Sequence, residues 1–285
     1  MKRNIYFCSF ADSSIVSALK RIGEEADNFK LFKEIILYTE KDLPPEIYDQ
    51  CQSIIEQTGS KRGYAYWSWK PAIIMDVLSK ITEGDVLFYC DAGAHLNSNG
   101  KSLLKKYIKK AIVNDIWVSQ LDNQYNDYAY TKTDTINIFK DKIKDPKILY
   151  TGQIQGGNII LTKNRYTLEL ISQWMELMDI KNLRYYDDSP SIAPNHKTFV
   201  ENRHDQSLFS LLIKTNHAFI EDAEKLWYPY ELWEICRLPI LNMRDKNNKY
   251  PTIDYTPKLK WLIKYLRWRY HSFLNKENQT VQKSN

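Results

Sequence analysis

An aspartate stands at the end of a strand-length apolar run, in the segment Asp91-Ala92-Gly93. The run Asp85–Cys90 is of the type buried on both faces of a parallel sheet. A carboxylate at the carboxyl end of such a strand lies where open α/β sheets bind ligands. There Asp91 could hold Mg²⁺ or Mn²⁺ on phosphate oxygens, or accept hydrogen bonds from ribose hydroxyls. The alternative is a turn that Asp91 closes and for which Gly93 supplies the backbone freedom.

A second candidate region is the aromatic loop that ends in Lys70-Pro71. Four of the six residues from 64 to 69 are aromatic, namely Tyr64, Tyr66, Trp67 and Trp69. Aromatic faces stack on uracil and on the C–H faces of sugars. Pro71 suits the first turn of a helix, so Arg62 and Lys70 precede a helix N-terminus, a combination that binds diphosphate. The alternative is a solvated loop lysine, with one or two of the aromatic residues in the core.

Polar residues also gather in the segment Glu201-Asn202-Arg203-His204-Asp205-Gln206, just before an apolar helical pattern. Capping of that helix explains one of them, Asp205 or His204, and leaves the others unexplained. Carboxylates at such a position can act as general bases.

Two further features bear on ligand binding. A metal on Asp91 would need more ligands, for which the candidates are His95 and, from later in the chain, Asp205 or His204. A structural hydrogen bond is the alternative for His204. Gly156-Gly157 precede a predicted strand and could bring backbone N–H groups close to a ligand. A bulge or tight turn explains these glycines equally well.

Alternating strands and helices must position these residues. The apolar, β-favouring segments predict strands at 4–10, 34–39, 85–90, 115–119 and 158–162. Predicted helices begin near Asp12 or Ser13, at Pro44-Pro45, near Pro71, at Ser102, near Asn164 and at His204-Asp205. This alternation predicts an α/β fold, with a mostly parallel sheet flanked by helices. Residues 120–150 lack clear periodicity and are open to two interpretations, a mobile substrate loop or a short hairpin.

The composition is that of a soluble globular protein. The 285 residues are 43% hydrophobic and 26% charged, enough for one large α/β domain with additions or two small ones. No apolar run approaches the ~20 residues that span a bilayer. The four cysteines have no CxxC spacing, which argues against a zinc site or a disulfide framework. We therefore expect a cytoplasmic protein.

The formal charge of +5 is concentrated near the C-terminus, where residues 258–276 contain seven basic residues, counting His271, and no acid. Their pattern predicts an amphipathic helix with Trp and Tyr at the edges of its apolar face. Such helices lie on anionic membrane surfaces, and the alternative is a helix docked on the main domain. Residues 277–285 are polar and predicted to be disordered.

Two sequence blocks carry a resemblance to a known family. The pattern Gly-Tyr-x-Tyr-Trp-Ser-Trp-Lys-Pro, followed by Gly-Asp-x-Leu-x-Tyr-x-Asp-Ala-Gly, resembles bacterial glycosyltransferases that build lipopolysaccharide, lipooligosaccharide and capsule. Gln155–Leu161 and Glu201–Ser207 match the same group. The resemblance implies a GT-A-like, Rossmann-like catalytic domain over residues 1–230, a C-terminal extension over 231–276 and a tail over 277–285. The Asp-x-Asp hallmark of GT-A enzymes is Asp-Ala-Gly here, which leaves the need for a metal open.

The resemblance also implies an activity. We expect transfer of a hexose such as galactose from a nucleotide-diphosphate sugar, UDP-linked, to a lipid-linked saccharide at the inner face of the cytoplasmic membrane. The implied donor-binding residues are Asp91, Gly93, Lys70, Arg62, Trp67, Trp69, Tyr66, Gly156 and Gly157. Asp205 is the predicted catalytic base and Glu201 the second candidate, with inverting and retaining chemistry both open. A divalent cation, Mn²⁺ or Mg²⁺, would use Asp91, His95 and His204.

Two other classes of protein stay open. Another nucleotide-sugar enzyme, such as a nucleotidyltransferase, would need a glycine-rich phosphate loop after the first strand, where the chain has Cys8-Ser9-Phe10-Ala11. A non-catalytic nucleic-acid-binding protein would use the basic tail and the aromatic residues, but its charge would be spread over its main domain. We therefore expect no nucleic-acid partner.

Overall fold

A computed structural model describes residues 3–216, 218, 220–222, 234 and 237–249 of the chain. The predicted basic helix at 258–276 and the tail at 277–285 lie outside this part. Within it, no helix combines the length and the apolar character needed to cross a bilayer.

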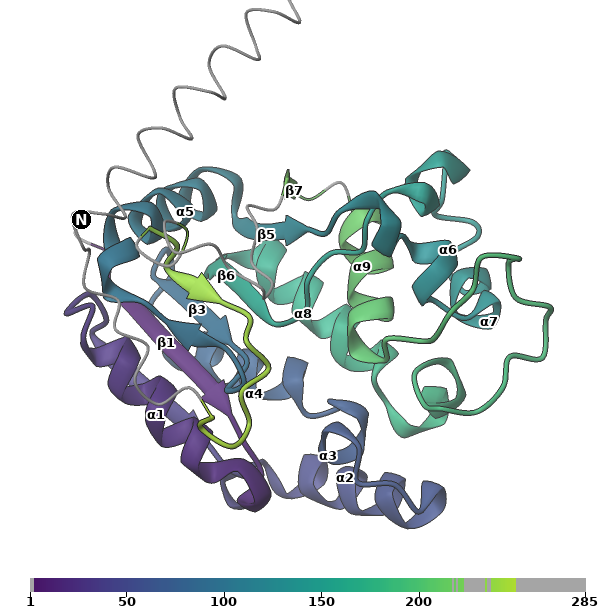
Figure 1. Cartoon of the computed structure of the whole chain (residues 1–285), viewed down its shortest axis with the longest axis horizontal. Helices are drawn as coiled ribbons and strands as arrows, with labels where there is room; N and C mark the ends of the chain where they lie inside the picture. The colour runs from purple at the N-terminus through teal and green to yellow at the C-terminus, as the bar shows by residue number, and fades with distance from the viewer. Residues whose placement is uncertain (1–2, 217, 219, 223–233, 235–236, 250–285) are drawn as a thin grey trace, which may run out of the picture.

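A six-stranded sheet forms the centre of the molecule (Figure 1). Its strands, in spatial order, are β2 (Glu34–Tyr38), β1 (Ile5–Phe10), β3 (Val86–Cys90), β6 (Asn158–Thr162), β5 (Ile116–Gln120) and β7 (Ile220–Asp222). Only β6 runs against its neighbours, β3 on one side and β5 on the other, while the other pairings are parallel. The predicted α/β class with a mostly parallel sheet is therefore confirmed. A separate two-stranded sheet joins β4 (His95–Leu96) to β8 (Ile240–Leu241).

Helices cover both faces of the sheet. The longer ones are α1 (Val16–Asp27), α2 (Pro45–Thr58), α4 (Lys70–Lys80), α5 (Lys101–Asn114), α8 (Arg165–Leu177) and α9 (Asp205–Thr215). Successive strand residues point to opposite faces. Phe7 and Phe88 therefore pack in one core with α1 and α5, and Cys8 and Tyr89 pack in the other with α4, α8 and α9.

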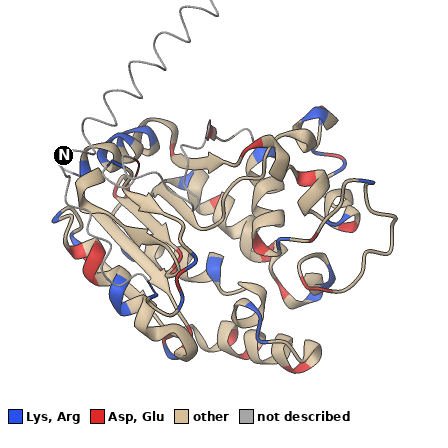
Figure 2. Cartoon of the chain, in the orientation of Figure 1, with Lys and Arg blue, Asp and Glu red and all other residues tan. Residues whose placement is uncertain are grey.

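Local sequence signals set several helix ends as expected. Helix α2 ends at Gly59, which adopts a left-handed φ of 65° that glycine tolerates best. Asn164 caps α8, and its side chain and that of Thr167 satisfy each other's backbone N–H groups. Lysines on the outer side of α5 give that helix a basic surface (Figure 2).

Residues 120–150 do not form the predicted hairpin, and short helices occupy much of the predicted loop. They fold into the short helices η4 (Asn123–Tyr125), α6 (Asp127–Tyr130), α7 (Thr133–Asn137) and η5 (Pro146–Tyr150). Elements of three to five residues are too short to show a 3.6-residue period. Three of them, η4, α6 and η5, begin at a side-chain cap, such as Asn126 on Ala129 N–H. A buried ion pair between Asp127 and Lys214, with 2.5 Å between Oδ2 and Nζ, ties α6 to α9.

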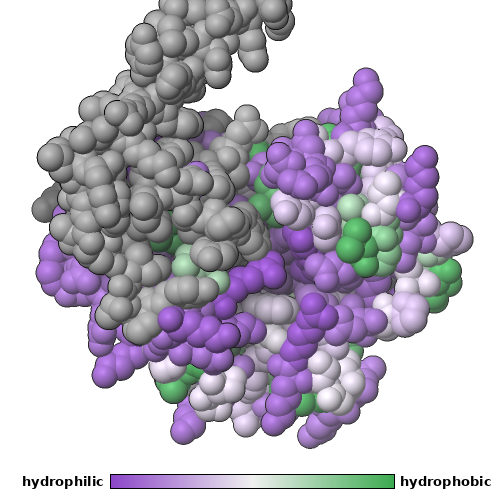
Figure 3. All heavy atoms as spheres, viewed as in Figure 1, coloured by the Kyte–Doolittle hydropathy of each residue, from purple (hydrophilic) through white to green (hydrophobic). Residues whose placement is uncertain are grey.

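The remaining short elements are α3 (Gly63–Tyr66), η1 (Ser13–Ile15), η2 (Glu40–Asp42), η3 (Ser98–Gly100) and η6 (Ile180–Tyr185). On the face seen in Figure 3, the described surface is mainly hydrophilic, and its hydrophobic side chains lie in small separate groups. No broad apolar patch is therefore visible from this side.

Candidate active site

A buried lysine joins two carboxylates at the carboxyl edge of the sheet. Lys70, the first residue of α4, has a side chain only 2% exposed, and its Nζ lies 2.6 Å from Asp205 Oδ2 and 3.2 Å from Asp91 Oδ1. The same Nζ donates to the carbonyl oxygen of Gly156 at 3.2 Å. An ammonium has three N–H donors. All three donors of Lys70 are therefore used within the protein.

The antiparallel strand β6 explains how these groups meet. Because β6 runs against β3, the residues that precede β6 lie at the edge where β3 ends. The Asp91 N–H donates to the Gly157 carbonyl at 2.9 Å, and a Cβ on Gly157 would lie 2.8 Å from Asp91 Oδ2. Gly157 thus permits a close approach between the backbone and the Asp91 carboxylate. Helix α9 brings Asp205 to the same place, 3.3 Å from the Cβ position of Gly156.

In this lysine cluster of Lys70, Asp91 and Asp205, the pKa of Asp205 is raised to about 6. Burial is the main cause, and repulsion from Asp91 adds to it, while Lys70 acts in the opposite direction. For Lys70, burial alone disfavours the ammonium, but the two carboxylates outweigh it and its pKa is raised. The Lys70 ammonium thus stays charged, and the buried Asp205 carboxyl holds its proton more tightly than an ordinary aspartate does.

Tyr89 completes the cluster from within the sheet. Its hydroxyl donates to Asp91 Oδ1 at 2.5 Å, because residues two apart on a strand share a face. Burial and the neighbouring Asp91 raise the pKa of Tyr89 well above its usual value, so the phenol stays protonated. The Asp91 side chain remains 39% exposed, so part of it faces solvent while Lys70 and Tyr89 contact its Oδ1 atom from the buried side.

A left-handed turn delivers Lys70 to this place. Gly63 and the next four residues, up to Trp67, all have φ between 47° and 63°. Each non-glycine residue in that region costs about 1–2 kcal/mol. A Cβ on Gly63 would lie 2.4 Å from the Trp67 ring, so glycine is required at the start of the turn. Trp69 Nε1 donates to the Gly63 carbonyl at 3.1 Å and closes the turn just ahead of α4.

Most of the aromatic residues of this turn serve the core. Tyr64, Tyr66 and Trp69 are buried, and the Trp69 ring stacks on Phe10 with 3.8 Å between centroids. Trp67 is only partly buried and stacks on His204 with 5.6 Å between centroids. Of the aromatic residues predicted to bind the donor, Trp67 is thus the one with a partly open ring.

His204 is the N-cap residue of α9, with a φ of 54°, and its side chain makes no capping hydrogen bond. Of the two capping candidates, His204 therefore does not cap the helix. The His204 Nδ1–H donates to the Tyr186 carbonyl at 2.6 Å. Its Nε2 is buried without a hydrogen-bond partner, 3.7 Å from Asp188 Oδ1. Burial lowers the pKa of His204, so the ring is neutral.

Two other predicted site residues lie apart from the lysine cluster. Arg62 pairs with Asp188 at 2.9 Å, and both side chains are about half exposed. Glu201 is 50% exposed, and its carboxylate contacts Arg203 Nε at 3.5 Å. The cluster therefore favours Asp205 over Glu201 as the acid or base of the site.

The three predicted metal ligands do not converge. Both ring nitrogens of His95 contact carboxylates, Glu25 at 2.8 Å and Asp245 at 3.0 Å. His204 Nδ1 is bonded to a carbonyl, as described above. Over the residues that the structure describes, no group of three or more His, Cys, Asp or Glu side chains could hold a metal ion. Asp91, His95 and His204 therefore do not form a metal site.

The loop after Asp91 is held by contacts that sequence reasoning missed. Arg21 of α1 donates to the carbonyls of Ala92 and Ala94, at 2.9 Å each. The Gly93 carbonyl accepts from Asp245 N–H at 2.8 Å, and the backbone of Arg244 lies against Gly93. The period-two spacing of Tyr89 and Asp91 could have revealed their contact. Arg244 carries no such signal, because it follows Asp91 by about 150 residues in an irregular segment.

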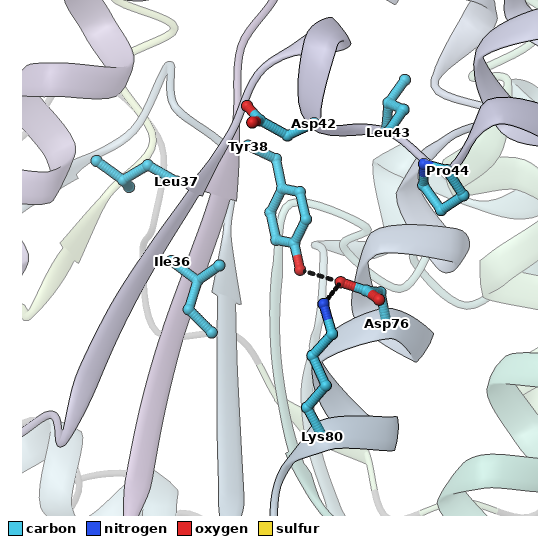
Figure 4. A pocket seen from close by; sticks show the side chains of 8 residues that line it. All are labelled: Ile36, Leu37, Tyr38, Asp42, Leu43, Pro44, Asp76 and Lys80. Atoms are coloured by element: carbon cyan, nitrogen blue, oxygen red, sulfur yellow. Dashed lines mark hydrogen bonds and ion pairs between the residues drawn. The ribbon is translucent and has the colours of Figure 1, made fainter.

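A separate pocket of about 420 Å³ lies between the edge strand β2 and α4 (Figure 4). Tyr38 and Lys80 both point to Asp76, at 2.5 Å and 2.6 Å, so these polar groups satisfy one another. The residues of the lysine cluster do not line it.

The fold and cluster define an α/β protein with a polar candidate active site at the carboxyl edge of its sheet. No protein-family model and no curated protein matches the chain.

Solved structures that are similar to it include three glycosyltransferases. A glycosyltransferase involved in the glycosylation of the major capsid of PBCV-1 aligns over 62% of this chain and 68% of its own, with 12% identity and a TM-score of 0.34. Mouse xyloside xylosyltransferase 1 aligns over 80% of this chain and 87% of its own, with 10% identity and a TM-score of 0.39. The glycosyltransferase GlyE of Streptococcus pneumoniae TIGR4 aligns over 95% of this chain and 64% of its own, with 13% identity and a TM-score of 0.39. This chain therefore spans less than two thirds of GlyE. Similarity at this level carries no conclusion about activity.

Replacing Lys70 with methionine should leave two facing carboxylates unpaired. We expect a loss of about 3–5 kcal/mol in the free energy of unfolding at pH 8. The loss should shrink as the pH falls. Without Lys70, the pKa of Asp205 in the folded state rises further above its ordinary 3.8, so the folded variant binds a proton that the unfolded chain does not.

Urea unfolding at pH 8 and pH 5.5 measures this change. Lys80→Met is the matched control, because Lys80 lies on the same helix and is 67% exposed; it should cost at most about 1 kcal/mol. An equal loss for Lys70→Met at both pH values would contradict the charge balance described above.

Proposed function

We propose that the chain is a glycosyltransferase that moves a hexose from a nucleotide-diphosphate sugar, UDP-linked, to a lipid-linked saccharide in bacterial surface-polysaccharide synthesis. One observation carries the proposal. The two main sequence blocks that resemble such enzymes contribute Lys70 and Asp91, and these residues meet Asp205, from the matching segment Glu201–Ser207, in one cluster. The rest of the proposal rests on the sequence resemblance.

The cluster offers a base for the transfer. In an inverting reaction, the bond between the anomeric carbon and the phosphate oxygen breaks, and its electron pair leaves with the diphosphate. The acceptor hydroxyl oxygen bonds to the anomeric carbon, and its proton passes to the Asp205 carboxylate. A pKa of about 6 suits this role, because the group is ionised at neutral pH and still accepts a proton.

The other groups of the cluster position the reactants. Lys70 orients Asp205 through its 2.6 Å contact, and Asp91 presents a solvent-facing carboxylate that can accept hydrogen bonds from donor hydroxyls. The partly open ring of Trp67 can stack on a base or a sugar. We further propose that residues 258–276, outside the described part, attach the enzyme to the anionic inner face of the membrane, where its lipid-linked acceptor lies.

A thermal-shift panel tests the proposed donor. UDP-, GDP-, CMP- and dTDP-sugars, each with and without Mn²⁺, are added to the full chain. A ligand that binds only the folded state raises its melting temperature. We expect stabilisation by UDP-sugars above the other classes. If none of the sugar nucleotides stabilises the chain, the proposed function is wrong.

Asp205→Asn should remove the base while keeping an oxygen near Lys70. We expect the transfer rate to fall by about 10²–10⁴-fold. In the wild type, the rate should fall as the pH drops below about 6, because the Asp205 carboxylate becomes protonated. The residual activity of the variant should lack this acidic limb. A pH–rate profile in which the variant retains the wild-type limb would assign the base to another residue.

Gly157→Ala should displace the Asp91 carboxylate, since the new Cβ would lie 2.8 Å from Oδ2. We expect loss of transfer with little change in melting temperature, because a flexible side chain can rotate away. Gly59→Ala is the contrasting control. It lies at the end of α2 with a φ of 65°, so alanine should cost about 1 kcal/mol of stability and leave the transfer rate unchanged. Normal activity in Gly157→Ala would show that the position of Asp91 is unimportant.

A further inference from the structure

The proposed site needs positive charge for the departing diphosphate, and the lysine cluster does not supply it. All three N–H donors of Lys70 are used by Asp91, Asp205 and the Gly156 carbonyl. The predicted metal ligands do not converge either. Another cation near Asp91 would fill this role. This inference rests on the proposed function.

Arg203 is a cation held in place by aromatic rings. Its guanidinium lies 3.7 Å from the Tyr130 centroid and 5.2 Å from that of Tyr125. Its side chain is 16% exposed, and its buried Nε lacks a hydrogen-bond partner, since the Glu201 carboxylate is 3.5 Å away. The group is therefore oriented in advance, and its hydrogen-bonding capacity is not used up by the protein.

Arg244 reaches the same region from a distant part of the chain. Its backbone lies against Gly93, two residues after Asp91, with 3.6 Å between the Arg244 Cα and the Cβ position of Gly93. Its side chain is exposed. The next residue, Asp245, fixes the segment through its N–H on Gly93 and its carboxylate on His95. The segment passes in front of the end of β3 (Figure 1).

The two arginines are close enough to repel each other. Burial lowers the pKa of Arg203, and the charge of Arg244 lowers it further. Two cations brought together beside an active-site turn favour an anion between them, because its charge would relieve the repulsion. Planar guanidinium groups also match phosphate oxygens in pairs of hydrogen bonds.

We infer that Arg203 and Arg244 bind the diphosphate of the sugar nucleotide next to Asp91 and Gly93, in place of a divalent cation. As the bond between the anomeric carbon and the phosphate oxygen breaks, the negative charge that develops on that oxygen is balanced by the two guanidinium groups. The donor sugar then lies between this diphosphate and Asp205.

The test measures binding of UDP and UMP to the full chain by isothermal titration calorimetry, in buffer containing EDTA. We expect the wild type to bind UDP more tightly than UMP under these conditions. Arg244→Gln and Arg203→Gln should each weaken UDP binding by about tenfold or more. Each should also reduce the difference in affinity between UDP and UMP. Lys246→Gln removes an exposed cation of the same segment and should bind UDP as the wild type does.

The fold of each variant is checked by its melting temperature. Arg244 is exposed, so its variant decides the outcome if Arg203→Gln is destabilised by loss of the tyrosine contacts. If Arg244→Gln binds UDP like the wild type, or if EDTA abolishes wild-type binding and Mn²⁺ restores it, this inference is wrong and the proposed function stands. If the wild type binds UDP neither in EDTA nor with added Mn²⁺, and no sugar nucleotide stabilises it in the thermal-shift panel, both are wrong.

Discussion

The ammonium group of Lys70 organises the candidate site. It is almost fully buried, and it connects the tip of β3, the turn before β6 and the start of α9 through Asp91, Gly156 and Asp205. A buried charge is costly unless it is paired and hydrogen-bonded, so these three segments must meet for the fold to be stable. The same buried arrangement raises the pKa of Asp205, because burial and the neighbouring Asp91 carboxylate together outweigh the opposing effect of Lys70.

The backbone around this group is shaped to meet the constraint. Five successive residues with positive φ place Lys70 at the start of α4. Gly157, which has no side chain, lets the backbone before β6 lie close to the Asp91 carboxylate. Both features are unfavourable in isolation. Core packing of Trp69 on Phe10 and the paired charges offset them. Strain of this kind concentrates at functional sites, because a stable core can support it there.

Much of the fold could be predicted from the sequence. The strands β1, β2, β3, β5 and β6 lie within a residue or two of their predicted positions, because buried strands have apolar, β-branched patterns bounded by turn residues. The reversed direction of β6 could not be predicted, since a strand's side-chain pattern is the same in both directions. The short helices of residues 120–150 have too few turns to produce a period, and three of them begin at a local side-chain cap instead.

The candidate site was predicted in part for similar reasons. Asp91, Lys70 and Asp205 were each singled out by local patterns, but their contact depends on tertiary structure. Sequence alone indicates a surface position for a lysine, because lysine is almost never fully buried unless it is paired. Trp69 resembled a ligand-stacking residue and is a core residue, since the left-handed turn rotates its ring inward against Phe10. Arg244 had no neighbouring motif, so only the folded chain connects it to Gly93.

The most direct test of the central claim is a pH titration of the aspartate carboxyl carbons by ¹³C NMR. Burial of Asp205 beside Asp91 and Lys70 predicts an aspartate with a midpoint of about 6, and this signal should be missing from Asp205→Asn. A spectrum in which every aspartate titrates near its ordinary value would contradict the account, because Asp205 would then not lie buried beside a second carboxylate.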